Sequence, residues 1–98
     1  MLNQVVLVGR LTNDLEKLDE NKSIITLAVS RSFKDENGEY GVDLVNCILW
    51  QGIAEKTMEY CHKGDIVGIK GRIQSDENKV IQIIAEKVSF LSSKAKDE

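Results

Sequence analysis

The sequence contains no proline and few aromatic residues, with one tryptophan, two tyrosines and two phenylalanines among 98 residues. Cysteine is also scarce. Cys47 and Cys61 lack the CxxC spacing of a metal or redox site, so both are expected to be packed free thiols in a reducing compartment. The first apolar run covers only Val5–Val8 and follows no basic segment, which predicts neither a signal peptide nor a membrane span. A cytoplasmic protein is therefore expected.

Basic residues are fewer than acidic residues in this chain. Thirteen Lys and Arg residues against 16 Asp and Glu give a net charge of -3, so the chain lacks the basic character of a whole nucleic-acid-binding domain. Any polyanion site must then be local. The single histidine is His62, no HExxH, CxxC or Gly-rich phosphate loop occurs, and 98 residues leave little room for a catalytic cleft. Neither an enzyme nor a metal or cofactor site is expected.

Hydrophobic periodicity predicts five strands and one helix. Short β-branched or alternating segments indicate the strands, and helical spacing that places Ala54, Met58 and Cys61 on one face indicates the helix. The predicted strands are Val5–Leu11, Ile24–Phe33, Val42–Trp50, Ile66–Gln74 and Val80–Leu91, and the predicted helix is Ile53–Lys63. The pair Asn37-Gly38 is a strong hairpin signal, so the second and third strands are expected to be antiparallel neighbours.

Three strands, a helix and two more strands in a short chain are the element order of an OB-fold. The predicted fold class is all-β with one helix, a five-stranded Greek-key barrel with the helix between strands three and four. Antiparallel connections throughout are compatible with this order, and a small sandwich or an SH3-like barrel is the alternative. The domain is expected to span residues 1–91, and residues 92–98 form a short polar C-terminal tail without apolar periodicity.

Acidic and basic residues are expected to separate on this barrel. The segment Asp-Glu-Asn occurs at residues 19–21, 35–37 and 76–78, each time in a predicted turn. The cations that sit on strands or at strand ends are Arg10, Arg31, Lys34, Lys70 and Arg72. A solvated strand position is an equal reading for each alone, but together they predict a phosphate-binding path on the sheet surface, with acidic turns at its rim.

Two aromatic residues are candidates for base stacking, which holds single strands without sequence preference. Phe33 ends the second strand and Trp50 ends the third. A core position at the barrel end is the alternative for Trp50. Tyr40, just after the hairpin, is a third candidate, whereas Tyr60 is assigned to helix packing.

Four blocks of the sequence resemble the bacterial single-stranded DNA-binding protein family. They are NQVVLVGRLT at residues 3–12, LAVSRSF at 27–33, VNCILW at 45–50 and KGDIVGIKGRIQ at 63–74. The resemblance covers nearly the whole chain and implies an OB-fold that wraps single-stranded DNA without catalysis. The chain resembles a short, tailless member: residues 75–79 replace a long hairpin with an acidic turn, Leu44 stands where an aromatic is frequent, and the acidic, Pro-containing tip is lacking.

The resemblance implies non-specific binding and protection of single-stranded DNA in replication, recombination or repair, without a cofactor. The DNA-binding residues implied are Arg10, Arg31, Phe33, Lys34, Trp50, Lys70 and Arg72. The alternative is a primosome-type OB-fold accessory module whose main partner is another replication protein. Contacts with replication or repair proteins are compatible with either reading, but not through an acidic C-terminal tip.

The first strand is apolar on both faces, with Val5 and Leu7 on one and Val6 and Val8 on the other. A barrel wall needs only one apolar face, so the second face is expected to meet a partner. In the resembled family this strand pairs across a two-fold axis. A homo-oligomer is therefore expected, a dimer at least and a tetramer beyond it.

Overall fold

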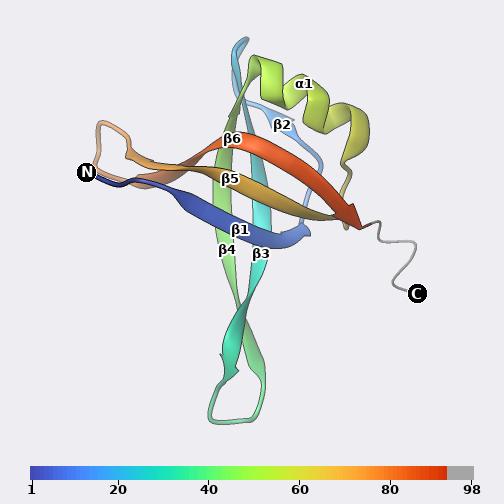
Figure 1. Ribbon diagram of the computed structural model, residues 1–98, viewed down its shortest axis with the longest axis vertical. Helices are drawn as coiled ribbons and strands as arrows, with labels where there is room; N and C mark the ends of the chain where they lie inside the picture. The colour runs from blue at the N-terminus through green and yellow to red at the C-terminus, as the bar shows by residue number, and fades with distance from the viewer. Residues whose placement is uncertain (93–98) are drawn as a thin grey trace.

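The computed structural model describes residues 1–92, which form six strands and one helix (Figure 1). The elements are β1 (Val5–Leu11), β2 (Glu16–Lys17), β3 (Lys22–Lys34), β4 (Tyr40–Trp50), α1 (Gln51–Tyr60), β5 (Ile66–Ser75) and β6 (Ile81–Ser92). The five long strands lie where the sequence predicts them, and the short β2 is additional. Of the predicted tail, Ser92 ends β6 and residues 93–98 lie outside the described residues. No helix of residues 1–92 is long and apolar enough to cross a membrane.

The five long strands close into one barrel, which confirms the predicted OB-fold. The sheet order is β1-β5-β6-β4-β3-β2, and an additional pairing between β1 and β3 closes the ring. Figure 1 shows β1, β5 and β6 crossing β3 and β4, with α1 between β4 and β5 in the chain. One pairing differs from a wholly antiparallel barrel, because β4 and β6 run parallel.

Alternate residues of the strands fill the barrel, as expected for strands with one buried face. The largest fully buried side chains are Ile25 and Leu27 of β3, Cys47 and Leu49 of β4, and Val67 and Ile69 of β5. Both cysteines are free and buried, as the sequence predicts. Burial raises the pKa of Cys47 to about 11, so this thiol stays protonated at neutral pH.

The helix begins and ends earlier than predicted, at Gln51–Tyr60 instead of Ile53–Lys63. It ends because the backbone at Cys61 is extended, with φ -120° and ψ 135°. Met58, assigned to the apolar face from its spacing, is exposed, whereas Thr57 is buried. Thr57 can be buried because its hydroxyl donates a 2.8 Å hydrogen bond to a backbone carbonyl of the preceding turn.

The three Asp-Glu-Asn segments lie in turns between strands, as predicted, and in each the aspartate side chain closes the turn. One carboxylate oxygen of Asp19, Asp35 and Asp76 accepts the backbone N–H of the asparagine two residues later, at 2.7, 2.8 and 2.8 Å. The same oxygen accepts a second backbone N–H at 2.9, 3.0 and 3.0 Å. The N–H of Asn21 holds the pKa of Asp19 below its ordinary value. These carboxylates are therefore part of the turn structure.

The β3–β4 and β5–β6 turns share one geometry. Asp35–Glu39 and Asp76–Val80 make backbone hydrogen bonds between equivalent positions, at 2.8 and 3.1 Å in the first turn and at 3.0 and 3.0 Å in the second. The fourth residue of each turn has a left-handed backbone, with φ 78° at Gly38 and φ 65° at Lys79. Glycine adopts this region freely, but a residue with a Cβ does not. The β5–β6 turn therefore carries strain that the β3–β4 turn avoids.

Replacing Lys79 by glycine is expected to raise the free energy of unfolding by about 1 kcal/mol, because the left-handed residue then has no Cβ. The reciprocal change, Gly38→Lys, is expected to lower it by a similar amount. Urea denaturation followed by circular dichroism, at one fixed protein concentration, measures both variants. Equal stability of the wild type and Lys79→Gly would contradict this account of the turn.

Candidate nucleic-acid interface

The outward side of β3 and β4 forms a continuous surface, called here the outer β3–β4 face. On β4 this face carries Leu44, Asn46, Ile48 and Trp50, which alternate along the strand with Val45, Cys47 and Leu49; Ile48 is buried and the other three are exposed. Trp50 is 45% exposed and Leu44 is also exposed. The indole therefore lies on the sheet surface. The alternative considered from the sequence, a core position at the end of the barrel, is not what the structure has.

Trp50 has a cation over its ring and a shallow hollow beside it. Lys22 lies opposite Trp50 in the β3–β4 ladder, and its ammonium nitrogen is 5.3 Å from the ring centroid. Both residues line a hollow of about 80 Å³, together with Gln74, Gln82 and Ile84. A partly exposed indole with a cation over its ring and two amides nearby can hold a flat ring by stacking and an anion by charge.

β3 and β4 continue beyond the barrel as a projecting hairpin, which extends away from α1 in Figure 1. Every residue from Ser30 to Tyr40 is exposed, including Phe33 at 64%. Lys34 pairs with Tyr40 in the ladder, and its ammonium nitrogen is 5.7 Å from the tyrosine ring centroid. A register shift lies between Ser30 and Lys34. The hairpin thus presents two aromatic rings and a lysine to solvent.

The three arginines predicted to bind DNA are all engaged by other groups of the chain. A terminal nitrogen of Arg31 lies 2.8 Å from a carboxylate oxygen of Asp43, and a terminal nitrogen of Arg72 lies 3.2 Å from one of Glu86. Arg10 donates a 2.6 Å hydrogen bond to a backbone carbonyl in the turn after α1. The guanidinium groups are therefore oriented by the protein itself.

The structure brings some of the predicted cations to the aromatic rings and places others elsewhere. Lys34 lies on the hairpin, and Arg72 lies beside the Trp50 hollow, where it donates a 3.4 Å hydrogen bond to Gln74. Lys70 pairs with a β1 residue and lines a separate hollow on the β1–β5 wall, and Arg10 lies at the end of β1. Outward side chains on different strands of a closed barrel point in different directions, so strand position alone does not gather the cations.

Sequence reasoning missed Lys22 as a candidate for the interface, because the predicted strand began at Ile24. Lys22 lies over Trp50 because of the β3–β4 register, and this register cannot be predicted from the Asn37-Gly38 turn. Tyr40 was only a third candidate, and its pairing with Lys34 strengthens it.

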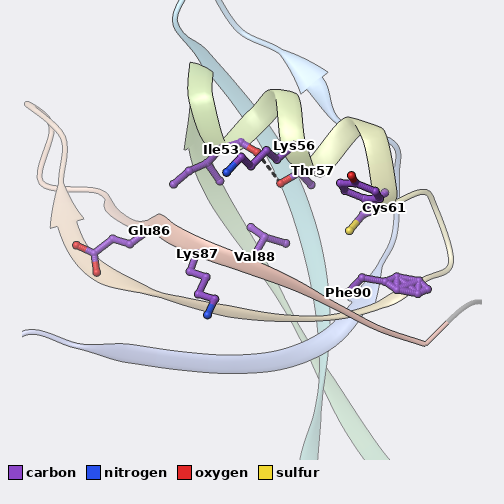
Figure 2. A pocket seen from close by; sticks show the side chains of 9 residues that line it. Ile53, Lys56, Thr57, Cys61, Glu86, Lys87, Val88 and Phe90 are labelled. Carbon is purple, nitrogen blue, oxygen red and sulfur yellow. Dashed lines mark hydrogen bonds between the residues drawn. The ribbon is translucent and has the colours of Figure 1, made fainter.

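A larger hollow lies between α1 and β6 (Figure 2) and has a volume of about 370 Å³. Its lining residues are Ile53, Lys56, Thr57, Tyr60, Cys61, Glu86, Lys87, Val88 and Phe90. Burial and the nearby Asp65 raise the pKa of the Cys61 thiol, so it is not activated as a nucleophile. Among residues 1–92, no His, Cys, Asp or Glu group is arranged to hold a metal ion. This hollow therefore offers a binding surface without a reactive group.

Comparison with known proteins identifies relatives along the whole chain. Residues 2–91 match the sequence model of the single-strand binding protein family. The chain is 44% identical to single-stranded DNA-binding protein B of Bacillus subtilis, with 100% of this chain and 97% of that protein aligned. It is 39% identical to the single-stranded DNA-binding protein of Lactiplantibacillus plantarum, of which it covers 55%, and 41% identical to single-stranded DNA-binding protein 1 of Streptococcus agalactiae, of which it covers 68%.

Proposed function

The chain belongs to the single-strand binding protein family, and we propose that it binds single-stranded DNA along the outer β3–β4 face and the projecting hairpin. The observation that carries this proposal is Trp50, an indole left 45% exposed on a sheet surface beneath Lys22. Proteins of this family bind DNA and are not enzymes. The proposed role is to bind and protect single strands in replication, recombination or repair, and the proposed location is the cytoplasm.

Bases are held by stacking on exposed rings. Trp50 and Phe33 are the main platforms, and each base stacked on a ring contributes about 1 to 3 kcal/mol. Leu44 lies on the same face of β4 between Trp50 and Tyr40, and it adds apolar contact without a ring. A DNA strand can therefore run from Trp50 along β4 to Tyr40. Phe33 precedes Lys34 in β3 and faces the other side of the hairpin, so the DNA reaches it by passing around the hairpin. Stacking uses the π-face of any base, so this path has no sequence preference.

Phosphates are held by the cations beside this path. Lys22 and Lys34 lie over the rings of Trp50 and Tyr40, where their ammonium groups can also reach the backbone of a stacked strand. Each phosphate contact releases counterions and makes binding weaker at high salt. In this proposal Arg10 and Lys70 contact phosphate only if the bound DNA continues around the barrel beyond the outer β3–β4 face.

A second copy of the chain covers the outward side of β1 in this proposal. Val6 and Val8 are 68% and 55% exposed, and they lie next to each other on the outward side of the β1–β5 wall. An apolar strip of this kind on a small domain is characteristic of an interface. The proposed assembly is a homodimer at least, and a tetramer if a second interface forms.

The α1–β6 hollow favours the second candidate function, an accessory module whose main partner is another replication protein. Tyr60 and Phe90 are exposed at this hollow and belong to no part of the proposed DNA path. The two candidate functions can be told apart with single-stranded DNA alone. A DNA-binding protein binds it tightly without a partner protein, and an accessory module does not.

Replacing Trp50 by alanine is expected to weaken oligo(dT) binding roughly 5- to 150-fold, the loss of one base stack. Fluorescence anisotropy of labelled oligo(dT), at two salt concentrations, measures the affinity, with oligo(U) and a duplex as competitors. Tyr60→Ala removes an exposed ring outside the path and is expected to bind like the wild type. Unchanged affinity of Trp50→Ala, or equal binding of the duplex, would refute the proposed interface.

Replacing Val6 and Val8 together by lysine is expected to break the oligomer, because both cations would be buried in the interface. Size-exclusion chromatography with light scattering should give at least twice the 11.0 kDa chain mass for the wild type and the single mass for the variant. Met58→Lys places a similar charge at an exposed helix position and is expected to leave the oligomer intact. A monomeric wild type at micromolar concentration would end this proposal.

A further inference from the structure

Two arginines are held by carboxylates, and the Arg31–Asp43 pair is the more complete. This pair lies on the projecting hairpin, on the side that carries Gly41 and opposite to the side that carries Leu44 and Trp50. The Nε of Arg31 donates to both carboxylate oxygens of Asp43 at 3.2 Å, and its Nη2 donates to Oδ1 at 2.8 Å. Arg72 makes one contact of 3.2 Å with Glu86. Arg31 therefore presents to Asp43 the same fork of N–H groups with which arginine binds a phosphate.

The backbone makes room for this pair at Gly41. A Cβ at Gly41 would lie 3.1 Å from Cδ and 3.2 Å from Nη1 of Arg31, so the arginine side chain crosses β4 where no side chain stands. Asp43 follows two residues later on the same strand. The position of the guanidinium group is thus set by the fold of the hairpin and not by chance contact.

The pair persists at neutral pH. The hydrogen bond from Arg31 holds the pKa of Asp43 below its ordinary value, and the same bond raises the pKa of Arg31. Both groups are therefore charged, and the stabilising effect of the pair is lost only as the pH falls through the lowered pKa of Asp43. Both side chains are about half exposed, and exposed ion pairs contribute little to stability. Stability alone is therefore a weak reason for the chain to form this pair with such complete geometry.

We infer that Asp43 competes with phosphate for Arg31 and so limits the affinity of the hairpin for single-stranded DNA. This inference rests on the proposed function. A phosphate that binds Arg31 must displace Asp43 from the fork or share the guanidinium group with it, and sharing places two anions side by side. The neutral pair also attracts no counterion to release, so Arg31 adds little to the salt dependence of binding.

Replacing Asp43 by asparagine is expected to tighten oligo(dT) binding roughly two- to five-fold at low salt, the range of one exposed charge pair. The plot of log affinity against log salt should become steeper by about 0.7 per subunit, the value for one added phosphate contact on a single strand. Fluorescence anisotropy at four or more salt concentrations measures both quantities. Thermal denaturation verifies the fold, and Asp43→Ser serves as the second variant if the amide perturbs the hairpin.

Glu36→Gln is the matched control. Glu36 lies in the same hairpin, is exposed and forms no ion pair among the described residues, so the variant makes the same charge change without releasing an arginine. Its slope should equal that of the wild type. The double variant Arg31→Ala/Asp43→Asn should lose the gain, because the released cation is then absent.

Three results would separate the possible failures. If the wild type binds oligo(dT) and Asp43→Asn behaves like Glu36→Gln, the competition is refuted and the proposed function stands. Weaker binding by a folded Asp43→Asn would also refute it, because Asp43 would then position Arg31 for phosphate. A wild type that does not bind oligo(dT) at all would refute the proposed function itself.

Discussion

The antiparallel ladder between β3 and β4 connects the core of this protein to its surface. It runs from the Lys22–Trp50 pair to Ser30–Val42, and after a register shift it resumes at Lys34–Tyr40. Because side chains alternate along each strand, the inward residues of the two strands fill the barrel and the outward ones form the surface that bears Trp50. Beyond the barrel the same ladder continues into the exposed hairpin, whose residues Ser30 to Tyr40 are all exposed and which is held mainly by its own backbone hydrogen bonds. The fold and the proposed interface thus depend on one register.

The acidic balance of the chain also has a structural origin. Asp19, Asp35 and Asp76 each accept two backbone N–H groups in a tight turn, a task for which a short side chain with an oxygen acceptor is suited. The net charge of -3 therefore reflects in part how the turns are built and not what the protein binds. Carboxylates that close turns lie at the ends of hairpins, away from the strand centres. Part of the excess of acid in this chain therefore lies in its turns.

Local alternation allowed the strands to be predicted, because each strand depends on spacing within one segment, and their order along the chain predicted the barrel. Alternation left Trp50 open between the core and the surface, and only the family resemblance favoured the surface. The pairing across strands could not be predicted in the same way. A regular hairpin continued from Lys34–Tyr40 would place Ile24 opposite Trp50, but the register shift places Lys22 there. The contact between Arg31 and Asp43 depends on that geometry as well, so a cation that looked available in the sequence is engaged in the structure. The parallel pairing of β4 with β6 is equally invisible, since it joins segments more than 30 residues apart in the chain.

That parallel pairing has a consequence for how the protein is made. Residues 47–49 pair with β3 on one edge, and on the other edge their partners are residues 83–85, near the end of the described chain. During translation, β4 therefore leaves the ribosome with one hydrogen-bonding edge open, and the barrel cannot close until β6 has emerged. An open edge beside the buried residues of β4 is a template for pairing with other nascent chains. The pairing of β6 with β4 thus covers an edge that is otherwise open to other chains.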